Sequence, residues 1–321
     1  MNKFNLLVAL VSVLFSCTDI TPENTPLAVA ELQAEIENKL SDQGIFDAWG
    51  ITRTNGQFII RSSSGVVRVP GESIGTLSRS AQPDGKSVLF YDFSLNKIVE
   101  YSAGQNQEMN TQIVELPEGK QHLAAIKGQD FMISTGLYDE GRYLYTANTG
   151  EAKYFVSYPK HPEMTEKLKS ILYASSVLRI RPDEKNFVCA DMYSGTMDFC
   201  RIENGKIELV KRLCLHAPDI RVQGNVNPKV RYTKENLMGF TDVAVSEDRV
   251  YALHSGKSFR QAGSDFSVCE ELLVYDWEGN LTDRFKLPAA VTSIDYNAVE
   301  NVIYAVENGA DAAILKIKLP D

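Results

Sequence analysis

The positively charged side chains that could bind an anion gather in and beside two long stretches between predicted strands, residues 216–238 and 256–271. The whole chain is acidic, with 42 acidic residues against 33 basic ones and a formal charge of −9. A local cationic patch in such a chain can select anionic groups such as carboxylates or uronic acids. The alternative is that these residues solvate loops or pair with nearby acids. The candidate ligand-binding residues are Arg221, Lys229, Arg231, His254, Lys257 and Arg260.

A different chemistry would use carboxylates. Asp242 and Asp295 each lie on the predicted innermost strand of a repeated unit, where they could line a common channel. Paired carboxylates carry out glycoside hydrolysis, and clustered oxygen ligands hold calcium. An enzyme of the lactonase, lyase or glycosidase type is therefore the alternative to a protein that only binds.

No familiar catalytic or metal motif accompanies these residues. The sequence contains no nucleophile elbow, P-loop, zinc-protease or EF-hand string, and its four histidines lack metal-ligand spacing. We therefore expect no metal and no cofactor. The negative net charge repels phosphate backbones, so we expect no nucleic-acid partner either.

Cys17 stands apart from the other four cysteines. It follows Lys3 and an apolar run over residues 6–15, which is the pattern of a signal peptide and is too short to span a membrane. Leu14 and Ser16, three and one residues before the cysteine, resemble the lipobox of bacterial lipoproteins. The resemblance implies a thioether lipid on Cys17 and a membrane as partner, since several acyl chains anchor stably. The alternative is an ordinary secretory signal with an incidental cysteine.

The segment after Cys17 is predicted as a polar tether followed by a short helix. Thr25 can cap residues 27–41, and Pro26 suits the first helical turn. One apolar stripe would pack this helix on the domain, and a coiled-coil partner is the less favoured role. The stripe consists of Val29, Leu32, Ile36 and Leu40. The predicted boundaries are thus 1–16 for the signal peptide and 17–44 for the lipidated tether and helix.

From Phe46 onward, short alternating runs separated by Gly, Asn and Asp turns indicate antiparallel strands. The clearest unit starts at Phe240, where FTDVAVSE turns into RVYALHSG and ELLVYDWEG turns into NLTDRFKLP. Similar units recur along the chain at intervals of about 30–65 residues, six in total. This recurrence predicts an all-β fold, a six-bladed β-propeller over residues 45–321. A β-sandwich or two small β-domains is the alternative.

The last predicted unit, VTSIDYNAVE–NVIYAVENG–AILKIKLP, ends after three strands. An N-terminal strand near residues 43–51 could supply the missing outer strand and close the ring.

The strings GFTDVAVSEDRVYAL and LLVYDWEGNLTDRFKLP, behind a signal lipobox, resemble the TolB-like six-bladed propeller lipoproteins of Bacteroidetes. The resemblance implies an outer-membrane lipoprotein that faces the periplasm or the cell surface. It brings no catalytic residues, so it favours non-catalytic binding. The ligand would be a glycan, an anionic small molecule or a protein partner.

The order of strands predicts which face of the propeller is elaborated. Turns between first and second strands are short, whereas three insertions fall in loops that belong to the opposite face. Long loops within a compact domain are often functional. The insertions cover residues 159–170, 216–238 and 256–271, and a helical stripe lies near residues 163–173.

Cys189 and Cys200 flank a predicted hairpin turn and would lie nearly opposite each other on adjacent strands. Export from the cytoplasm would permit a disulfide between them. Two buried thiols are the favoured alternative, because free cysteine behaves as a small core residue.

Overall fold

The computed structural model describes residues 27–54, 56–63, 65–69, 73–75, 80–83, 87–92, 95–103, 109–224 and 229–320. The predicted signal peptide and Cys17 lie outside these residues. Nearly all regular structure in the described part is β-strand, so the predicted all-β class is confirmed. None of the described helices is long and apolar enough to cross a bilayer.

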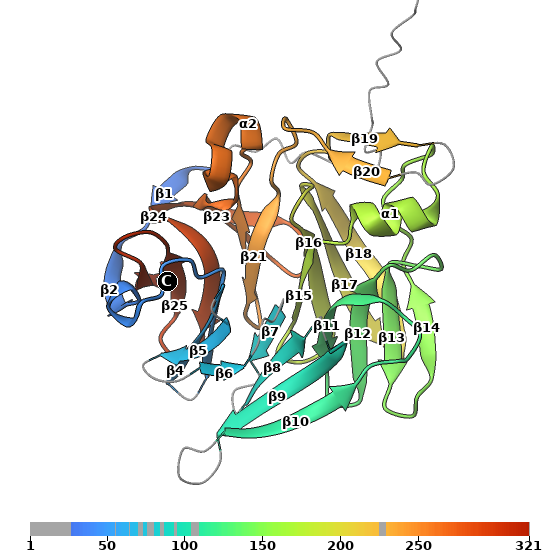
Figure 1. The fold of residues 1–321 in the computed structure, drawn as a ribbon, viewed down its shortest axis with the longest axis horizontal. Coiled ribbons are helices and arrows are strands. Elements are labelled where there is room, and N and C mark those ends of the chain that lie inside the picture. The colour runs from blue at the N-terminus through green and yellow to red at the C-terminus, as the bar shows by residue number, and fades with distance from the viewer. Residues whose placement is uncertain are drawn as a thin grey trace, which may run out of the picture.

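Four sheets contain four antiparallel strands each and correspond to the first four predicted units (Figure 1). The first holds β3 (Gly50–Thr54), β4 (Gln57–Ser62), β5 (Gly65–Val69) and β6 (Ser73–Gly75). The second holds β7 (Ser80–Pro83), β8 (Ser87–Asp92), β9 (Lys97–Ala103) and β10 (Met109–Glu115). The third holds β11 (His122–Lys127), β12 (Phe131–Gly136), β13 (Tyr143–Ala147) and β14 (Ala152–Phe155). The fourth holds β15 (Ser176–Ile180), β16 (Asn186–Asp191), β17 (Thr196–Glu203) and β18 (Lys206–Cys214).

The last two predicted units share one eight-stranded sheet. Its strands are β1 (Val29–Glu31), β2 (Ala34–Lys39), β21 (Phe240–Val245), β22 (Val250–His254), β23 (Cys269–Tyr275), β24 (Leu281–Asn297), β25 (Val302–Glu307) and β26 (Ala313–Lys318). The long β24 joins the two units, because its first half pairs with β23 and its second half with β25. β1 adds in parallel to the first half of β24.

The predicted helix over residues 27–41 is wrong. These residues form β1 and β2 instead, and β2 pairs with β26 as the outer strand that the last unit lacks. Hydrogen bonds to an open sheet edge outweigh the local helical pattern. Leu32 and Leu40 are buried as expected, whereas Ile36 is 61% exposed. An N-terminal strand therefore does complete the last unit, but it lies at residues 34–39 rather than 43–51.

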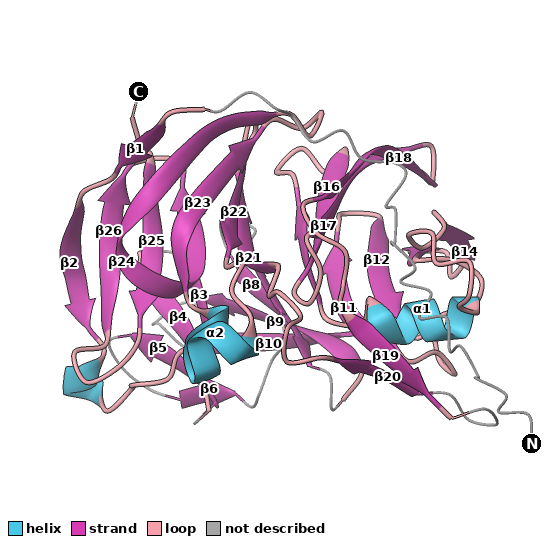
Figure 2. Cartoon of the chain, turned by 90° about the horizontal axis from the view of Figure 1, so that it is seen from above, coloured by secondary structure: helices cyan, strands magenta, loops and turns pink. Residues whose placement is uncertain are grey.

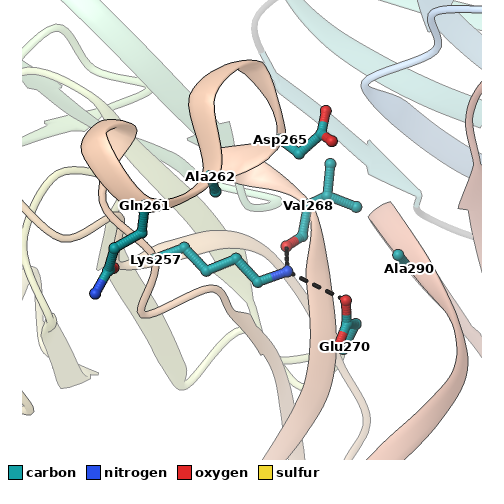
Figure 3. Close-up of a pocket in the computed structure, with 7 residues that line it drawn as sticks. All are labelled: Lys257, Gln261, Ala262, Asp265, Val268, Glu270 and Ala290. Carbon is teal, nitrogen blue, oxygen red and sulfur yellow. Dashed lines mark hydrogen bonds and ion pairs between the residues drawn. The ribbon is translucent and has the colours of Figure 1, made fainter.

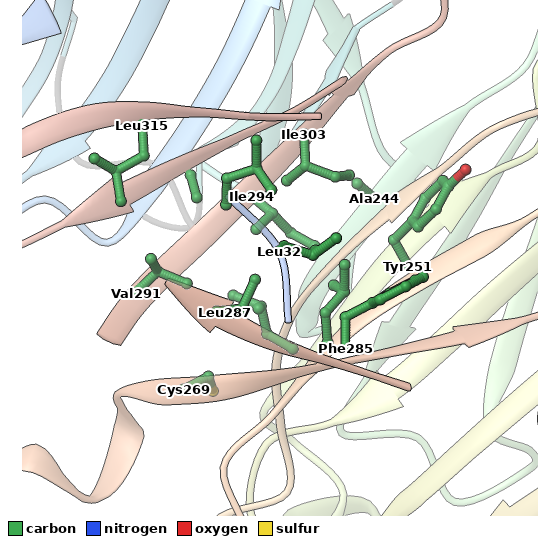
Figure 4. Close-up of a cluster of buried hydrophobic side chains, with 14 of the residues drawn as sticks. Leu32, Ala244, Tyr251, Cys269, Phe285, Leu287, Val291, Ile294, Ile303 and Leu315 are labelled. Carbon is green, nitrogen blue, oxygen red and sulfur yellow. The ribbon is translucent and has the colours of Figure 1, made fainter. Parts of the chain in front are cut away.

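Apolar clusters join each sheet to its neighbour. Ile59 of the first sheet packs with Phe90 of the second, and Ile133 of the third packs with Phe187 of the fourth. One cluster also joins the first sheet to the strands of the last unit. Central strands such as β16 are buried on both faces, because sheets pack against both sides of them. Figure 4 shows the cluster inside the eight-stranded sheet, where Leu32 of the N-terminal segment packs among side chains of β22 to β26.

The innermost strands contact one another in sequence: β3 with β7, β7 with β11, β11 with β15, β15 with β21, β21 with β24, and β24 with β3. Figure 2 shows the same sheets from above. Two hydrogen bonds link the first sheet to the last unit, from Ile51 N to Ser293 Oγ at 3.0 Å and from Arg53 N to Asp295 Oδ2 at 2.6 Å.

Cys189 and Cys200 are free, buried thiols. The register of β16 and β17 places Cys189 opposite Asp198 and Cys200 opposite Phe187, so the two cysteines are diagonal rather than opposite neighbours. The alternative of two core thiols is thus the one that the structure contains.

Candidate binding face

The three predicted insertions lie together along the upper margin of Figure 1. They contain α1 (Glu166–Leu172), the hairpin of β19 (Ile220–Gln223) and β20 (Lys229–Tyr232), and α2 (Phe259–Ala262) followed by the 3-10 helix Gly263–Ser267. Tyr232 Oη donates to Leu172 O at 2.5 Å, and Arg260 N donates to Lys234 O at 2.9 Å. These bonds connect the first insertion to the second and the second to the third. The prediction of one elaborated face is confirmed, and we call it the binding face.

Local sequence explains why these insertions are ordered. Thr165 caps α1 by accepting a hydrogen bond from Leu168 N at 3.3 Å. Ser258 and Gln261 form a reciprocal capping box at α2. A small apolar core then holds α1 against the hairpin. Its members are Tyr158, Met164, Leu168, Leu172, Tyr173, Ile220, Val230 and Tyr232.

The β19–β20 hairpin has one apolar and one cationic face. The register places Ile220 opposite Tyr232 and Arg221 opposite Arg231, and directly opposed residues share a face. Ile220 and Tyr232 pack inward, whereas Arg221, Arg231 and Lys229 are exposed. The three predicted cations of this insertion are therefore brought together on the outward face of one hairpin.

The cations of the third insertion already have acidic partners. The Arg260 Nε group pairs with the Glu235 carboxylate. Lys257 Nζ donates to Val268 O at 3.2 Å and lies 3.3 Å from Glu270 Oε1. Both pairs match the alternative that the sequence left open, in which basic loop residues pair with nearby acids.

A pocket of about 590 Å³ opens beside α2 (Figure 3). In the figure the Lys257 side chain extends toward Glu270. Because Glu270 balances the charge of Lys257, the pocket offers polar donors and acceptors without a strong net charge. Its lining residues are Lys257, Gln261, Ala262, Asp265, Val268, Glu270 and Ala290.

His254 does not supply a positive charge at neutral pH. Burial, and to a smaller extent His216, whose ring centre lies 5.8 Å away, lower the pKa of His254 to about 4. His254 also packs on Phe240 at 5.3 Å between ring centres. Its place in the binding face is therefore that of a neutral packing residue. No group of three or more metal-ligating side chains occurs in the part of the chain that the structure describes.

A family model described as TolB-like 6-blade propeller-like matches residues 63–298, more than half of the chain. The chain belongs to this TolB-like family. The RRP9 WD40 repeats are similar to the TolB-like chain at 11% identity and a TM-score of 0.49, over 90% of this chain and 100% of that one. Hydrazine synthase of Kuenenia stuttgartiensis matches at 11% identity and a TM-score of 0.46, over 85% of this chain and 96% of that one. The Pan2 WD40 domain of Neurospora crassa matches at 12% identity and a TM-score of 0.44, over 84% of this chain and 89% of that one. No curated protein matches the TolB-like chain.

In the TolB-like chain the two predicted channel acids lie close together among buried charges. Asp242 Oδ1 accepts from Arg179 Nη2 at 2.8 Å and from Val243 N at 2.9 Å. Its Oδ2 accepts from the Ser293 hydroxyl and from Ile294 N at 3.2 Å. Four hydrogen bonds use the full acceptor capacity of a carboxylate. Asp242 therefore ties three successive units together, and its oxygens are already occupied.

Asp295 is the less saturated of the two acids. Burial raises the pKa of Asp295 to about 7, although the backbone N–H of Arg53 stabilises its charged form. Arg61 lies near both acids, and burial lowers its pKa to about 10 against the opposing effect of Asp242. These residues form a compensated set of buried charges on the inner strands of the TolB-like fold.

Sequence reasoning missed a second buried ionic cluster, between the third and fourth sheets. Arg142 Nη1 lies 2.9 Å from Asp198 Oδ2, and Arg142 Nη2 lies 2.7 Å from Asp191 Oδ1. Arg212 Nε contacts the other Asp198 oxygen at 2.6 Å. Although burial favours the neutral form, Arg142 and Arg212 hold the pKa of Asp198 below its usual value. An acid inside an otherwise apolar strand, as Asp198 is in MDFC, is the sequence signal for such a cluster.

Proposed function

We propose that this protein is a membrane-anchored, non-catalytic binding protein built as a closed six-bladed propeller. In this proposal the eight-stranded sheet counts as two blades that share β24, and β2 completes the last one. The ring of contacts between innermost strands supports closure, as does the apolar cluster that joins first and last units.

The anchor is proposed to be a lipid on Cys17, as in the Bacteroidetes lipoproteins whose signal the sequence resembles. The protein would then sit on the outer membrane and face the periplasm or the cell surface. Metabolic labelling with palmitate tests this directly. The wild-type chain should take up label, and Cys17→Ala should not; label on Cys17→Ala would contradict the proposal.

The observation that carries the binding function is the pocket of about 590 Å³ beside α2, on the elaborated face. Its volume falls within the range of small-molecule sites. Because Lys257 is balanced by Glu270 at 3.3 Å, the pocket suits a hydroxyl-rich molecule such as a short glycan better than a simple anion. Gln261 and Asp265 add further hydrogen-bonding groups at its wall.

A thermal-shift screen of glycans and metabolites against a chain that starts at residue 18 tests this function. Such a chain retains every described strand. A ligand that binds the folded state at about 100 times its Kd stabilises it by about 2.7 kcal/mol. Lys257→Ala should abolish the shift, and Lys120→Ala, which breaks an exposed pair with Glu140, should preserve it. A shift that survives Lys257→Ala would place the ligand elsewhere.

The enzyme alternative is less well supported, because the four hydrogen bonds at Asp242 leave it no free lone pair for a substrate or metal. Metal analysis of the purified protein separates the two functions. Stoichiometric calcium or zinc would count against pure binding.

A further inference from the structure

The outward face of the β19–β20 hairpin carries a ladder of cations without partners. Among the residues that the structure describes, the side chains of Arg221, Lys229 and Arg231 make no hydrogen bond or ion pair. Arg221 lies directly opposite Arg231, and like charges in that position destabilise a strand pair. Folding alone gives no reason to place two arginines there, so an external anion is the simplest explanation of the arrangement.

The hairpin holds this ladder in a fixed orientation. Its inner face packs on α1 through Ile220, Val230 and Tyr232. The hydrogen bond from Tyr232 Oη to Leu172 O at 2.5 Å fastens the hairpin to the end of α1. Arg221 and Arg231 therefore lie on a hairpin that packing and a hydrogen bond hold against α1.

Large apolar side chains are also exposed on the binding face, on each of its three insertions or beside them. Phe259 of α2 is 47% exposed, and Val222, which lies opposite Val230 on the apolar side of the hairpin, is 45% exposed at its edge. Leu215, which follows β18, is 49% exposed, and Ile171 of α1 is 37% exposed. Basic residues combined with exposed Phe, Leu and Ile are typical of surfaces that lie in the headgroup region of a bilayer.

We propose that the cationic hairpin face docks the protein onto an anionic lipid surface, as a second membrane contact in addition to the anchor. This inference builds on the proposed membrane location. The tether between Cys17 and β1 spans at most about 40 Å, so it keeps the domain close to the bilayer. Each basic residue near an anionic bilayer raises the affinity about fivefold. The ladder is open and lies outside the pocket beside α2, which favours an extended surface over a small soluble anion.

Vesicle sedimentation with the lipid-free chain that starts at residue 18 tests the inference independently of Cys17. The probes are vesicles of equal parts phosphatidylglycerol and phosphatidylcholine, and vesicles of phosphatidylcholine alone. The protein should bind the anionic vesicles and should release as salt screens the charges. Arg221→Glu with Arg231→Glu should weaken this binding by at least about 30-fold, since each lost cation accounts for about fivefold.

Lys185→Glu with Lys206→Glu is the matched control, because both lysines are exposed, lie in or next to hairpin turns outside the three insertions and give the same change in charge. This control should bind like the wild type. Arg221→Gln with Arg231→Gln is a second variant that should melt at or above the wild-type temperature while losing binding, because it removes the repulsion between opposed arginines.

The inference is overturned if the wild type binds both vesicle types equally, or if both arginine variants still bind the anionic vesicles. Binding to soluble polygalacturonate but not to vesicles would also overturn it and would assign the ladder to an anionic glycan. None of these outcomes bears on the pocket, whose ligand is tested through Lys257. Failure of the docking inference is thus distinguishable from failure of the proposed function.

Discussion

Replacing Arg142 by Met should destabilise the protein far more than removing an exposed charge. The Arg142 side chain is 1% exposed and bridges Asp191 at 2.7 Å and Asp198 at 2.9 Å. Met occupies much of the same space but leaves both carboxylates without this cation. Asp198 keeps Arg212 at 2.6 Å. Among described side chains, Asp191 keeps the Ser176 hydroxyl at 2.7 Å and the more distant Ser194.

Breaking a buried pair by removing one partner destabilises by about 3–5 kcal/mol, since an uncompensated charge stays buried. Asp191 makes this loss depend on pH. Burial already raises the pKa of Asp191 from 3.8 to about 6, and Arg142 opposes that rise. When an acid has a higher pKa in the folded state than in the unfolded state, its contribution to the free energy of unfolding is complete below the unfolded-state pKa. That contribution is lost as pH rises through the folded-state pKa. Without Arg142 the pKa of Asp191 rises further, so the variant continues to lose free energy of unfolding above pH 6. The destabilisation caused by Arg142→Met therefore grows toward alkaline pH.

Urea denaturation of the chain that starts at residue 18, at about pH 4.5 and about pH 8, measures both effects. Arg201→Met is the matched control, because its ion pair with Glu208 is 3.9 Å long and half exposed. Exposed pairs contribute about 0–1 kcal/mol, and the control should lose no more than that at either pH. If Arg142→Met lowers the free energy of unfolding no more than Arg201→Met does at the higher pH, the buried cluster does not stabilise the fold. An equal loss at both pH values would refute the role of Asp191.

Three further outcomes follow from buried groups and strand pairing. Burial raises the pKa of Asp295 from 3.8 to about 7, so wild-type stability should fall as pH rises across that interval; Asp295→Asn should flatten this segment of the pH–stability curve, and a parallel curve would contradict it. Cys189 and Cys200 are buried with raised thiol pKa values, so a thiol reagent should modify them only after unfolding, and rapid labelling of the native protein would contradict their placement. A chain that starts at residue 41 lacks β1 and β2 and exposes the edge of β26; it should aggregate in size-exclusion chromatography, and a stable monomer would show that β2 is dispensable.

The repeated strands could be predicted because their signals are local. Asn204 and Gly205 both have positive φ, at 51° and 71°, and close a two-residue hairpin between Glu203 and Lys206. An Asn-Gly pair between two strand-like runs is enough to predict such a turn. The N-terminal strands could not be read in this way. The spacing of Leu32, Ile36 and Leu40 fits a helix. The strand that pairs with this segment, β26, lies at the other end of the chain, so no local pattern reveals the pairing.

The binding face shows the same division between local and distant information. The sequence identified the insertions and their charges, and α1 arose where a helical stripe was expected. It could not show which cations are neutralised. Glu235 and Arg260 belong to different insertions, and only folding brings them together. The alternation of β19 and β20, which places Arg221 and Arg231 on one outward face, depends equally on strand register.

β2 ties the proposed lipid anchor into the sheet that also contains the C-terminal strand. β2 pairs antiparallel with β26 from Ala34 opposite Ile317 to Lys39 opposite Ala313. A pull on the proposed anchor would reach β1 first, which pairs with β24, and then β2, so both pairings would have to break before this segment detaches. Leu40 at the end of β2 is fully buried in the cluster that joins the first and last units. In the proposed anchored protein, the segment that would lead to the membrane is therefore the same segment whose Leu40 packs between the first and last units.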